Sequence, residues 1–168
     1  MAGLWERERL AVLRIRVIVV DRTRLPFLRD GESFYTRRVR RYATLEWTEV
    51  RPAKMSRGRP EREVLGEEGS NILKRVSPED FLVALDRSGR LLDSERLAGW
   101  LAELSGRGME WLTFVIGGPL GLSGEVLSRA RETLALSRFT FTHEMSRLVL
   151  LEQLYRAYTI LRGERYHK

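Results

Sequence analysis

Two periods of apolar residues follow one another along the chain, and each predicts a different kind of element. Apolar residues at every second position, or in short unbroken runs, are typical of β-strands, whereas apolar residues every three or four positions are typical of helices. The pattern predicts strands over 13–20, 44–50, 81–85, 111–116 and 134–141. It predicts helices over 25–41, 61–75, 93–104, 123–130 and 144–161. Strands and helices therefore alternate from one end of the chain to the other.

Two of the predicted strands are apolar at nearly every position. They contain the FLVAL run at 81–85 and the TFVI run at 113–116. A strand of this kind is buried on both faces, as in parallel sheets that are covered by helices. The sequence therefore predicts an α/β fold with a mostly parallel sheet and helices on both faces. In such folds ligands bind beyond the carboxyl ends of the strands.

The length and composition limit the class of protein. A chain of 168 residues fits one domain, which we expect to span 13–168 after a loose N-terminal extension at 1–12. There is no cysteine, which excludes disulfides, thiolate catalysis and cysteine-bound metals. No apolar run is long enough to cross a bilayer, so we expect no membrane partner and a cytoplasmic location.

Positive charge is concentrated in the first part of the chain. Residues 1–62 contain 16 basic and 8 acidic residues, a net charge of +8, whereas the remainder carries a net charge of −1. Arginines bind phosphates with paired hydrogen bonds and release counterions from nucleic acids, so this asymmetry favours contact with RNA or DNA. The alternative is a solvated surface in an arginine-rich genome, because 27 of the 30 bases are arginine.

The segment FVIGGPLGLS, at 114–123, leads from a predicted strand into a glycine-rich loop. Gly117, Gly118 and Gly121 leave its backbone bare at the edge where such sheets bind ligands. The spacing matches neither the dinucleotide fingerprint nor the phosphate loop of nucleotide triphosphatases, so a flat base or a thioether fits better than a phosphate. The alternative is a tight turn with Pro119 at its corner.

Few side chains are candidates for chemistry. His143 and His167 are the only histidines, too few for a typical metal site, and we expect no metal. The chain also lacks the G-x-S-x-G signature of a serine nucleophile. Arg156 lies in an otherwise apolar stretch of the last helix and needs an acceptor. Either a ligand or Glu152, one turn earlier, can provide it.

Several segments together resemble the RlmH family. These are the SPOUT-superfamily enzymes that methylate N3 of a pseudouridine in 23S rRNA. The segments are VALDRSGRLLDSERLA, VIGGPLGLS, LSRFTFTHEMSRLVLLEQLYRAY and the terminal RGERYHK. The resemblance covers about 13–168 and is most specific in the last third. It departs from the family at Thr142, where many relatives have proline. It implies a C-terminal trefoil knot, S-adenosylmethionine as methyl donor and a homodimer.

The resemblance also implies roles for individual residues. The cofactor contacts carry over to Leu85, Gly117, Leu136, Ser137, Arg138, Phe139, Thr140 and Phe141. The catalytic or substrate-facing positions carry over to His143, Arg156, Tyr166 and His167. Methylation of N3 requires the anion of a weak acid, which Arg156 can stabilise while a histidine or Tyr166 takes the proton or holds the base. We expect Tyr166 and His167 to be ordered by a partner subunit or by RNA.

The substrate is expected to be 23S rRNA within the large subunit or the whole ribosome. No RNA-binding domain is appended, so we expect Arg37, Arg38, Arg40 and Arg41 to contact the RNA. Two alternatives remain open. One is a SPOUT methyltransferase that acts on another RNA such as tRNA, and the other is a non-catalytic RNA-binding factor in ribosome assembly.

Overall fold

A parallel sheet forms the middle layer of the molecule. The computed structural model describes residues 12–167, so the expected extension at 1–12 lies outside the described residues except for its last position. Within that range the strands are β1 (Arg14–Val20), β2 (Thr44–Val50), β3 (Phe81–Leu91), β4 (Leu112–Ile116) and β5 (Glu132–Ala135). They lie in the order β2-β1-β4-β3-β5, and every neighbouring pair is parallel. The predicted α/β fold is confirmed.

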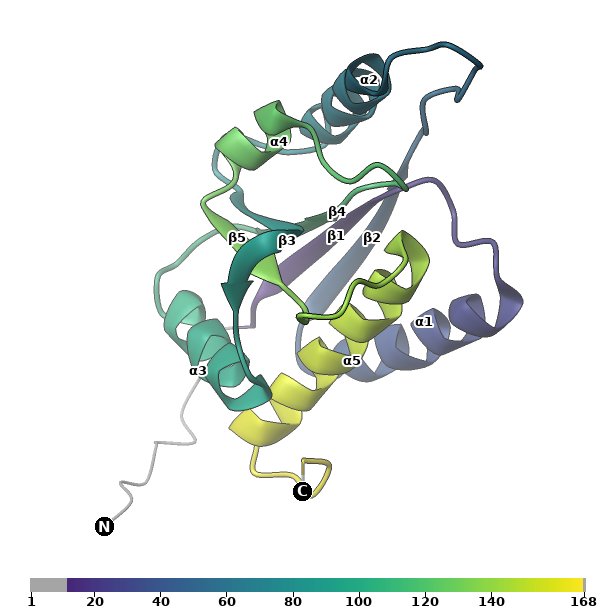
Figure 1. Ribbon diagram of the computed structural model, residues 1–168. Coiled ribbons are helices and arrows are strands. Elements are labelled where there is room, and N and C mark those ends of the chain that lie inside the picture. The colour runs from purple at the N-terminus through teal and green to yellow at the C-terminus, as the bar shows by residue number, and fades with distance from the viewer. Residues whose placement is uncertain (1–11, 168) are drawn as a thin grey trace.

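Helices cover both faces of the sheet (Figure 1). They are α1 (Pro26–Val39), α2 (Glu61–Leu73), α3 (Ser94–Ser105), α4 (Gly124–Arg129) and α5 (His143–Leu161). The first, third and fifth helices pack together on one face, and α2 and α4 pack together on the other. None of these helices is both long and apolar enough to cross a bilayer.

Side-chain caps fix the starts of three helices. The side chains of Asp93, Ser123 and Thr142 accept hydrogen bonds from backbone N–H groups in the first turns of α3, α4 and α5. An N-cap of this kind satisfies a donor that would otherwise lack a partner and stabilises a helix by about 1 kcal/mol. Thr142 thus has a structural use in this chain.

The predicted strand at 134–141 is wrong at both ends. The strand is Glu132–Ala135, and the chain leaves the sheet at Leu136. It then runs through an irregular segment to α5, in which Phe139 is 82% exposed. The alternating apolar residues of this segment resemble a strand, but β5 is an edge strand whose only neighbour, β3, pairs with it no further than Ala135.

The strand predicted at 81–85 continues to Leu91, with an irregularity in the middle of β3. Leu85 and Arg90 both pair with Leu134, and the four residues between them are looped out. The Asp86 carboxylate accepts a hydrogen bond from the Ser88 N–H at 2.9 Å. A side chain at Gly89 would collide with the backbone of Leu134, which explains glycine there.

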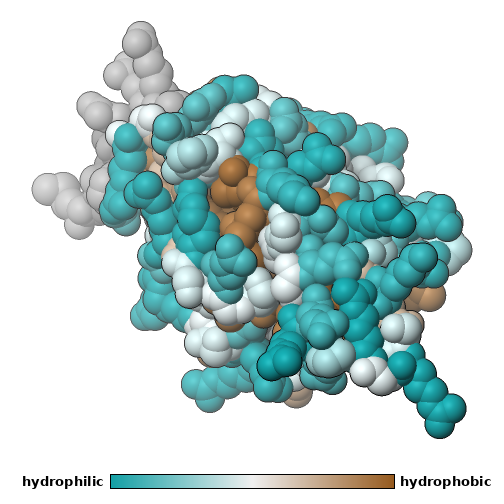
Figure 2. All heavy atoms as spheres, turned by 90° about the horizontal axis from the view of Figure 1, so that it is seen from above, coloured by the Kyte–Doolittle hydropathy of each residue, from teal (hydrophilic) through white to brown (hydrophobic). Residues whose placement is uncertain are grey.

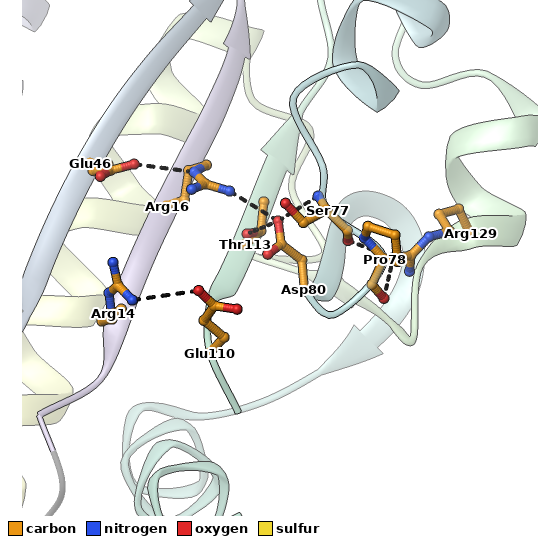
Figure 3. Close-up of polar contacts among 9 residues, drawn as sticks. All are labelled: Arg14, Arg16, Glu46, Ser77, Pro78, Asp80, Glu110, Thr113 and Arg129. Atoms are coloured by element: carbon orange, nitrogen blue, oxygen red, sulfur yellow. Dashed lines mark hydrogen bonds and ion pairs between the residues drawn. The ribbon is translucent and has the colours of Figure 1, made fainter. Parts of the chain in front are cut away.

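A buried carboxylate joins the amino ends of the central strands (Figure 3). Asp80, only 1% exposed, accepts hydrogen bonds from Arg16 of β1 at 3.0 Å, Thr113 of β4 at 3.1 Å and the Ser77 N–H at 3.2 Å. Arg16 also stacks on the ring of Trp111, 4.3 Å from its centroid. This cluster fixes the edge of the sheet opposite to the one where ligands are expected.

Candidate active site

A cavity of about 250 Å³ lies between the sheet and two of its helices, at the carboxyl ends of β3 and β5. Its walls come from β3, β4, β5, the start of α3 and the middle of α5. The lining residues are Leu85, Leu92, Ser94, Leu97, Phe114, Leu134, Ala135, Leu136, Leu150 and Gln153. The cavity is therefore mainly apolar, with two polar side chains, and lies at the edge where a parallel sheet binds its ligands.

The structure brings two of the predicted cofactor contacts to this cavity. Leu85 and Leu136 line it from the ends of neighbouring strands. The rest of the predicted run, Ser137 to Phe141, follows Leu136 along the irregular segment towards α5. Within this segment the Ser137 hydroxyl accepts a hydrogen bond from the Phe139 N–H at 2.9 Å, which shapes the backbone there. Arg138, Phe139 and Thr140 are exposed.

Gly117 does not line the cavity but begins the turn that follows β4. The Gly121 N–H donates to the Gly118 carbonyl at 3.0 Å, so Pro119 stands at the corner of a tight turn. A side chain at Gly117 would collide with the carbonyl group of Gly121, whose own φ of 87° also favours glycine. The turn therefore explains these two glycines without a ligand.

A buried glutamate lies behind this turn. Glu68 of α2 is 4% exposed, and one carboxylate oxygen accepts a hydrogen bond from the Ala53 N–H at 3.1 Å. The other oxygen faces Gly118 and has no hydrogen-bond partner among the described residues. Burial raises the pKa of Glu68. Because its neighbour Gly69 packs against Ser123, α2 supports both ends of the glycine turn.

Three of the four predicted catalytic residues lie together at the end of α5. Arg156 donates to the Glu152 carboxylate, as the sequence had allowed, and its guanidinium lies 4.7 Å from the ring centroid of Tyr166. The Tyr166 hydroxyl donates to the same carboxylate at 3.1 Å. Nδ1 of His167 lies 3.5 Å from Nη1 of Arg156. The four side chains form one polar group around a shared carboxylate.

Contacts within the chain hold the terminal residues in this arrangement, and a further ordering by a partner subunit or by RNA stays a prediction. The ring of Tyr166 packs on Tyr155 with centroids 4.6 Å apart, and its hydroxyl lies 3.3 Å from that of Tyr35. Burial is the largest influence on the Tyr166 hydroxyl, followed by the hydrogen bond with Tyr35 and the nearby Glu152, and together they raise its pKa. The phenol therefore stays protonated at neutral pH.

Gln153 connects the cavity with this polar group, and sequence reasoning missed it. Its amide oxygen accepts a hydrogen bond from Ser94 at 2.6 Å, inside the cavity wall, and its amide nitrogen donates to Glu152 at 2.6 Å. No local pattern in the sequence marks Gln153, because its partner Ser94 lies 59 residues away. An unbroken chain of hydrogen bonds thus runs from the cavity to Arg156 and Tyr166.

His143, the fourth predicted catalytic residue, lies elsewhere. It is the first residue of α5, and the 13 positions between it and Arg156 span about 20 Å of helix. Beside it the fully buried Arg147 donates to the Val20 carbonyl at 2.6 Å and to the Thr23 hydroxyl at 2.9 Å. Burial and then the Arg147 charge lower the pKa of His143. The imidazole is therefore neutral at neutral pH.

The four arginines predicted to contact RNA lie at the end of α1 and have unequal freedom. Arg38 stacks on Phe34 at 4.1 Å and contacts the Tyr155 hydroxyl at 3.5 Å, and Arg40 donates two hydrogen bonds to the Leu45 carbonyl. Arg37 and Arg41 are exposed and make no side-chain hydrogen bond or ion pair within residues 12–167.

Comparison with known proteins gives a consistent result. The profile of a family described as predicted SPOUT methyltransferases matches residues 13–167. The chain is 41% identical over 160 residues to the ribosomal RNA large subunit methyltransferase H of Carboxydothermus hydrogenoformans, covering 93% of this chain and all of that relative.

Two solved structures have a similar fold at low sequence identity. A probable methyltransferase from Bordetella pertussis superposes with a TM-score of 0.55 at 13% identity, covering 86% of this chain and 94% of that one. The tRNA (m1G37) methyltransferase of Aquifex aeolicus superposes with a TM-score of 0.52 at 15% identity, covering 92% of this chain and 73% of that one. At such identities the likeness concerns the fold alone.

Proposed function

The chain belongs to the SPOUT methyltransferase family, and from this premise we propose that it transfers a methyl group from S-adenosylmethionine to N3 of a pseudouridine in 23S rRNA. The observation that carries the proposal is the hydrogen-bonded path from the strand-end cavity, through Gln153 and Glu152, to Arg156 and Tyr166. This path links the cavity to two side chains, Arg156 and Tyr166, that can stabilise a developing anion by charge and by a hydrogen bond.

The cavity residues suit the proposed cofactor. The leucines from the ends of β3 and β5 offer flat apolar contact for an adenine ring, and Ser94 and Gln153 offer hydrogen bonds. When bound, S-adenosylmethionine supplies an electrophilic methyl group on a sulfonium. The segment 137–141, which is exposed at Arg138, Phe139 and Thr140, follows the cavity wall directly, so it is suited to cover a bound molecule.

The polar group at the end of α5 would prepare the acceptor base. A pseudouridine N3 must lose its proton before it can attack, and the Arg156 guanidinium would stabilise the resulting anion. Tyr166 stays protonated, so its hydroxyl would hold the base by donating a hydrogen bond rather than take the proton. His167, beside Arg156, is the proton acceptor that we propose.

A homodimer belongs to the same proposal. The aromatic face of α5 gives it no support, because Tyr155 and Tyr158 are 6% and 5% exposed within the chain. A group of exposed apolar residues lies instead on and before α1, where Leu25, Phe27 and Phe34 are 48%, 63% and 41% exposed. A partner would also be needed for His143 to approach the Arg156 group. The trefoil knot, the cytoplasmic location and the use of assembled ribosomes stay predictions.

Transfer of labelled methyl groups tests the function. The protein, S-adenosylmethionine with a tritiated methyl group and ribosomes that lack the modification are incubated together, with tRNA in a parallel reaction. We expect label in 23S rRNA and none when Arg156 is replaced by alanine. Label in tRNA would instead support a SPOUT enzyme of another RNA. No label in either RNA, with ribosome binding intact, would support a non-catalytic assembly factor.

A further inference from the structure

The loop between β2 and α2 carries positive charge that the proposed chemistry does not use. Residues 51–60 include four basic and no acidic residues. Arg51, Lys54 and Arg57 are exposed, and their side chains form no ion pair or hydrogen bond within the part of the chain that the structure describes. Unpaired cations this close together repel one another, so their grouping is more easily explained by an anionic partner.

The fourth base, Arg59, has a different use because it holds the loop in shape. Its guanidinium donates to the Lys54 carbonyl at 2.9 Å and pairs with Glu67 of α2 at 2.6 Å. At the start of the loop the Asn71 side chain donates to the Arg51 carbonyl at 3.0 Å. The three free cations are thus presented on a backbone that α2 braces, which lowers the entropy cost of binding through them.

Helix α2 also connects this loop with the glycine turn. The Ala53 N–H of the loop donates to one oxygen of Glu68, and the other oxygen of this buried carboxylate faces Gly118. The loop follows the carboxyl end of β2, so it shares an edge of the sheet with the cavity. The arginines at 37–41 lie at the other end of β2, whose length corresponds to about 20 Å.

The surface around the loop is suited to a hydrated, charged partner. Seen from above, the end of the molecule that carries α2 and this loop is mostly hydrophilic, with a small hydrophobic area near its middle (Figure 2). Met55, between the basic residues, is 66% exposed and offers an apolar contact for a ribose or a base. Cations beside one apolar side chain match an RNA strand, which has both phosphates and sugar or base surfaces.

We infer that Arg51, Lys54 and Arg57 form a docking surface for the phosphate backbone of the RNA substrate, at the same carboxyl edge of the sheet as the cavity. The inference rests on the proposed function for the identity of the RNA. The loop would hold the rRNA at the edge where the methyl donor binds, and Glu68 would connect its backbone with the glycine turn.

The test compares two triple variants of the full chain by sedimentation with ribosomes at several salt concentrations. The first is Arg51→Gln, Lys54→Gln and Arg57→Gln. The matched control is Lys74→Gln, Arg75→Gln and Arg107→Gln, which removes the same charges from the ends of α2 and α3 near the opposite edge. None of the three loop side chains makes a hydrogen bond or ion pair within residues 12–167, so thermal unfolding of the first variant should match that of the wild type.

We expect the loop variant to lose most of its affinity for ribosomes. The slope of log affinity against log salt should fall by about three, one for each phosphate contact, while the control should keep the slope of the wild type. Equal slopes for the loop variant and the wild type would overturn the inference. The inference would also be overturned if the loop residues bound the protein to anionic phospholipid vesicles and not to ribosomes.

The same experiment separates this inference from the proposed function. If the wild type binds ribosomes through the loop but transfers no methyl group to them, the docking surface stands and the proposed activity fails. If methyl transfer persists with an unchanged KM for ribosomes in the loop variant, the activity stands and the docking surface fails. If the wild type binds no RNA at all, both fail.

Discussion

At the scale of single residues, Asp80 joins distant parts of the chain. Its carboxylate accepts hydrogen bonds from Arg16, which is 64 positions away, and from Thr113, which is 33 positions away (Figure 3). One of its oxygens has no hydrogen-bond partner among the described residues. Such a group is costly to bury, and its removal takes an acceptor from three donors, Arg16, Thr113 and the Ser77 N–H.

Replacing Asp80 by alanine should lower the free energy of unfolding by about 2–4 kcal/mol, because Arg16 and Thr113 both lose a buried acceptor. Urea denaturation measures this change. The control is Glu46→Ala, which removes the exposed partner of the same arginine and should cost less than about 1 kcal/mol. If both substitutions lowered the free energy of unfolding by the same amount, burial of Asp80 would not explain how strongly its contacts stabilise the protein.

At the scale of elements, the sequence was most informative where local rules decide the structure. The strand predicted at 44–50 is confirmed, and of the two acceptors that the sequence allowed for Arg156 the structure has Glu152; both depend on residues close in sequence. The end of β5 depends on whether a neighbouring strand is present, which no local pattern records. Gln153 and Glu68 were missed for the same reason, since their partners Ser94 and Ala53 belong to other elements.

The C-terminal segment after α5 offers the clearest test of an element. Deleting residues 165–168 should reduce kcat by about tenfold to a thousandfold, because it removes Tyr166 and His167, while the affinity for S-adenosylmethionine stays nearly unchanged. Single-turnover methyl transfer and calorimetry measure the two quantities. Tyr166→Phe keeps the ring on Tyr155 but loses the hydroxyl contacts with Glu152 and Tyr35, so its effect should be smaller.

If the deletion lowered the affinity for S-adenosylmethionine as much as it lowered kcat, the C-terminal segment would not act on catalysis alone. This result would mean that the segment supports the cavity, through Glu152 and Gln153, rather than the acceptor base. Unchanged turnover in the deletion variant would remove Tyr166 and His167 from the chemistry altogether.

At the scale of the whole molecule, the exposed aromatic residues of α1 are the feature that the single chain leaves unexplained. Phe27 and Phe34 are seven positions apart, which is nearly two helical turns, so they lie on the same side of α1. Gly31, four positions after Phe27, lies against Leu148 of α5, so the two phenylalanines flank the side of α1 that packs against α5. Two exposed phenylalanines on one helix face are typical of a surface that contacts another protein.

If a second copy of this chain covers that face, Phe27→Glu should weaken the dimer by roughly 30-fold or more, as expected for a central aromatic side chain worth about 2 kcal/mol. Sedimentation equilibrium measures the dissociation constant. Met55→Glu, which changes an equally exposed apolar residue on the β2–α2 loop, should leave it unchanged. Because His143 can approach Arg156 only from a partner, a monomeric Phe27 variant that kept full methyl transfer would show that one chain is sufficient and that His143 takes no part.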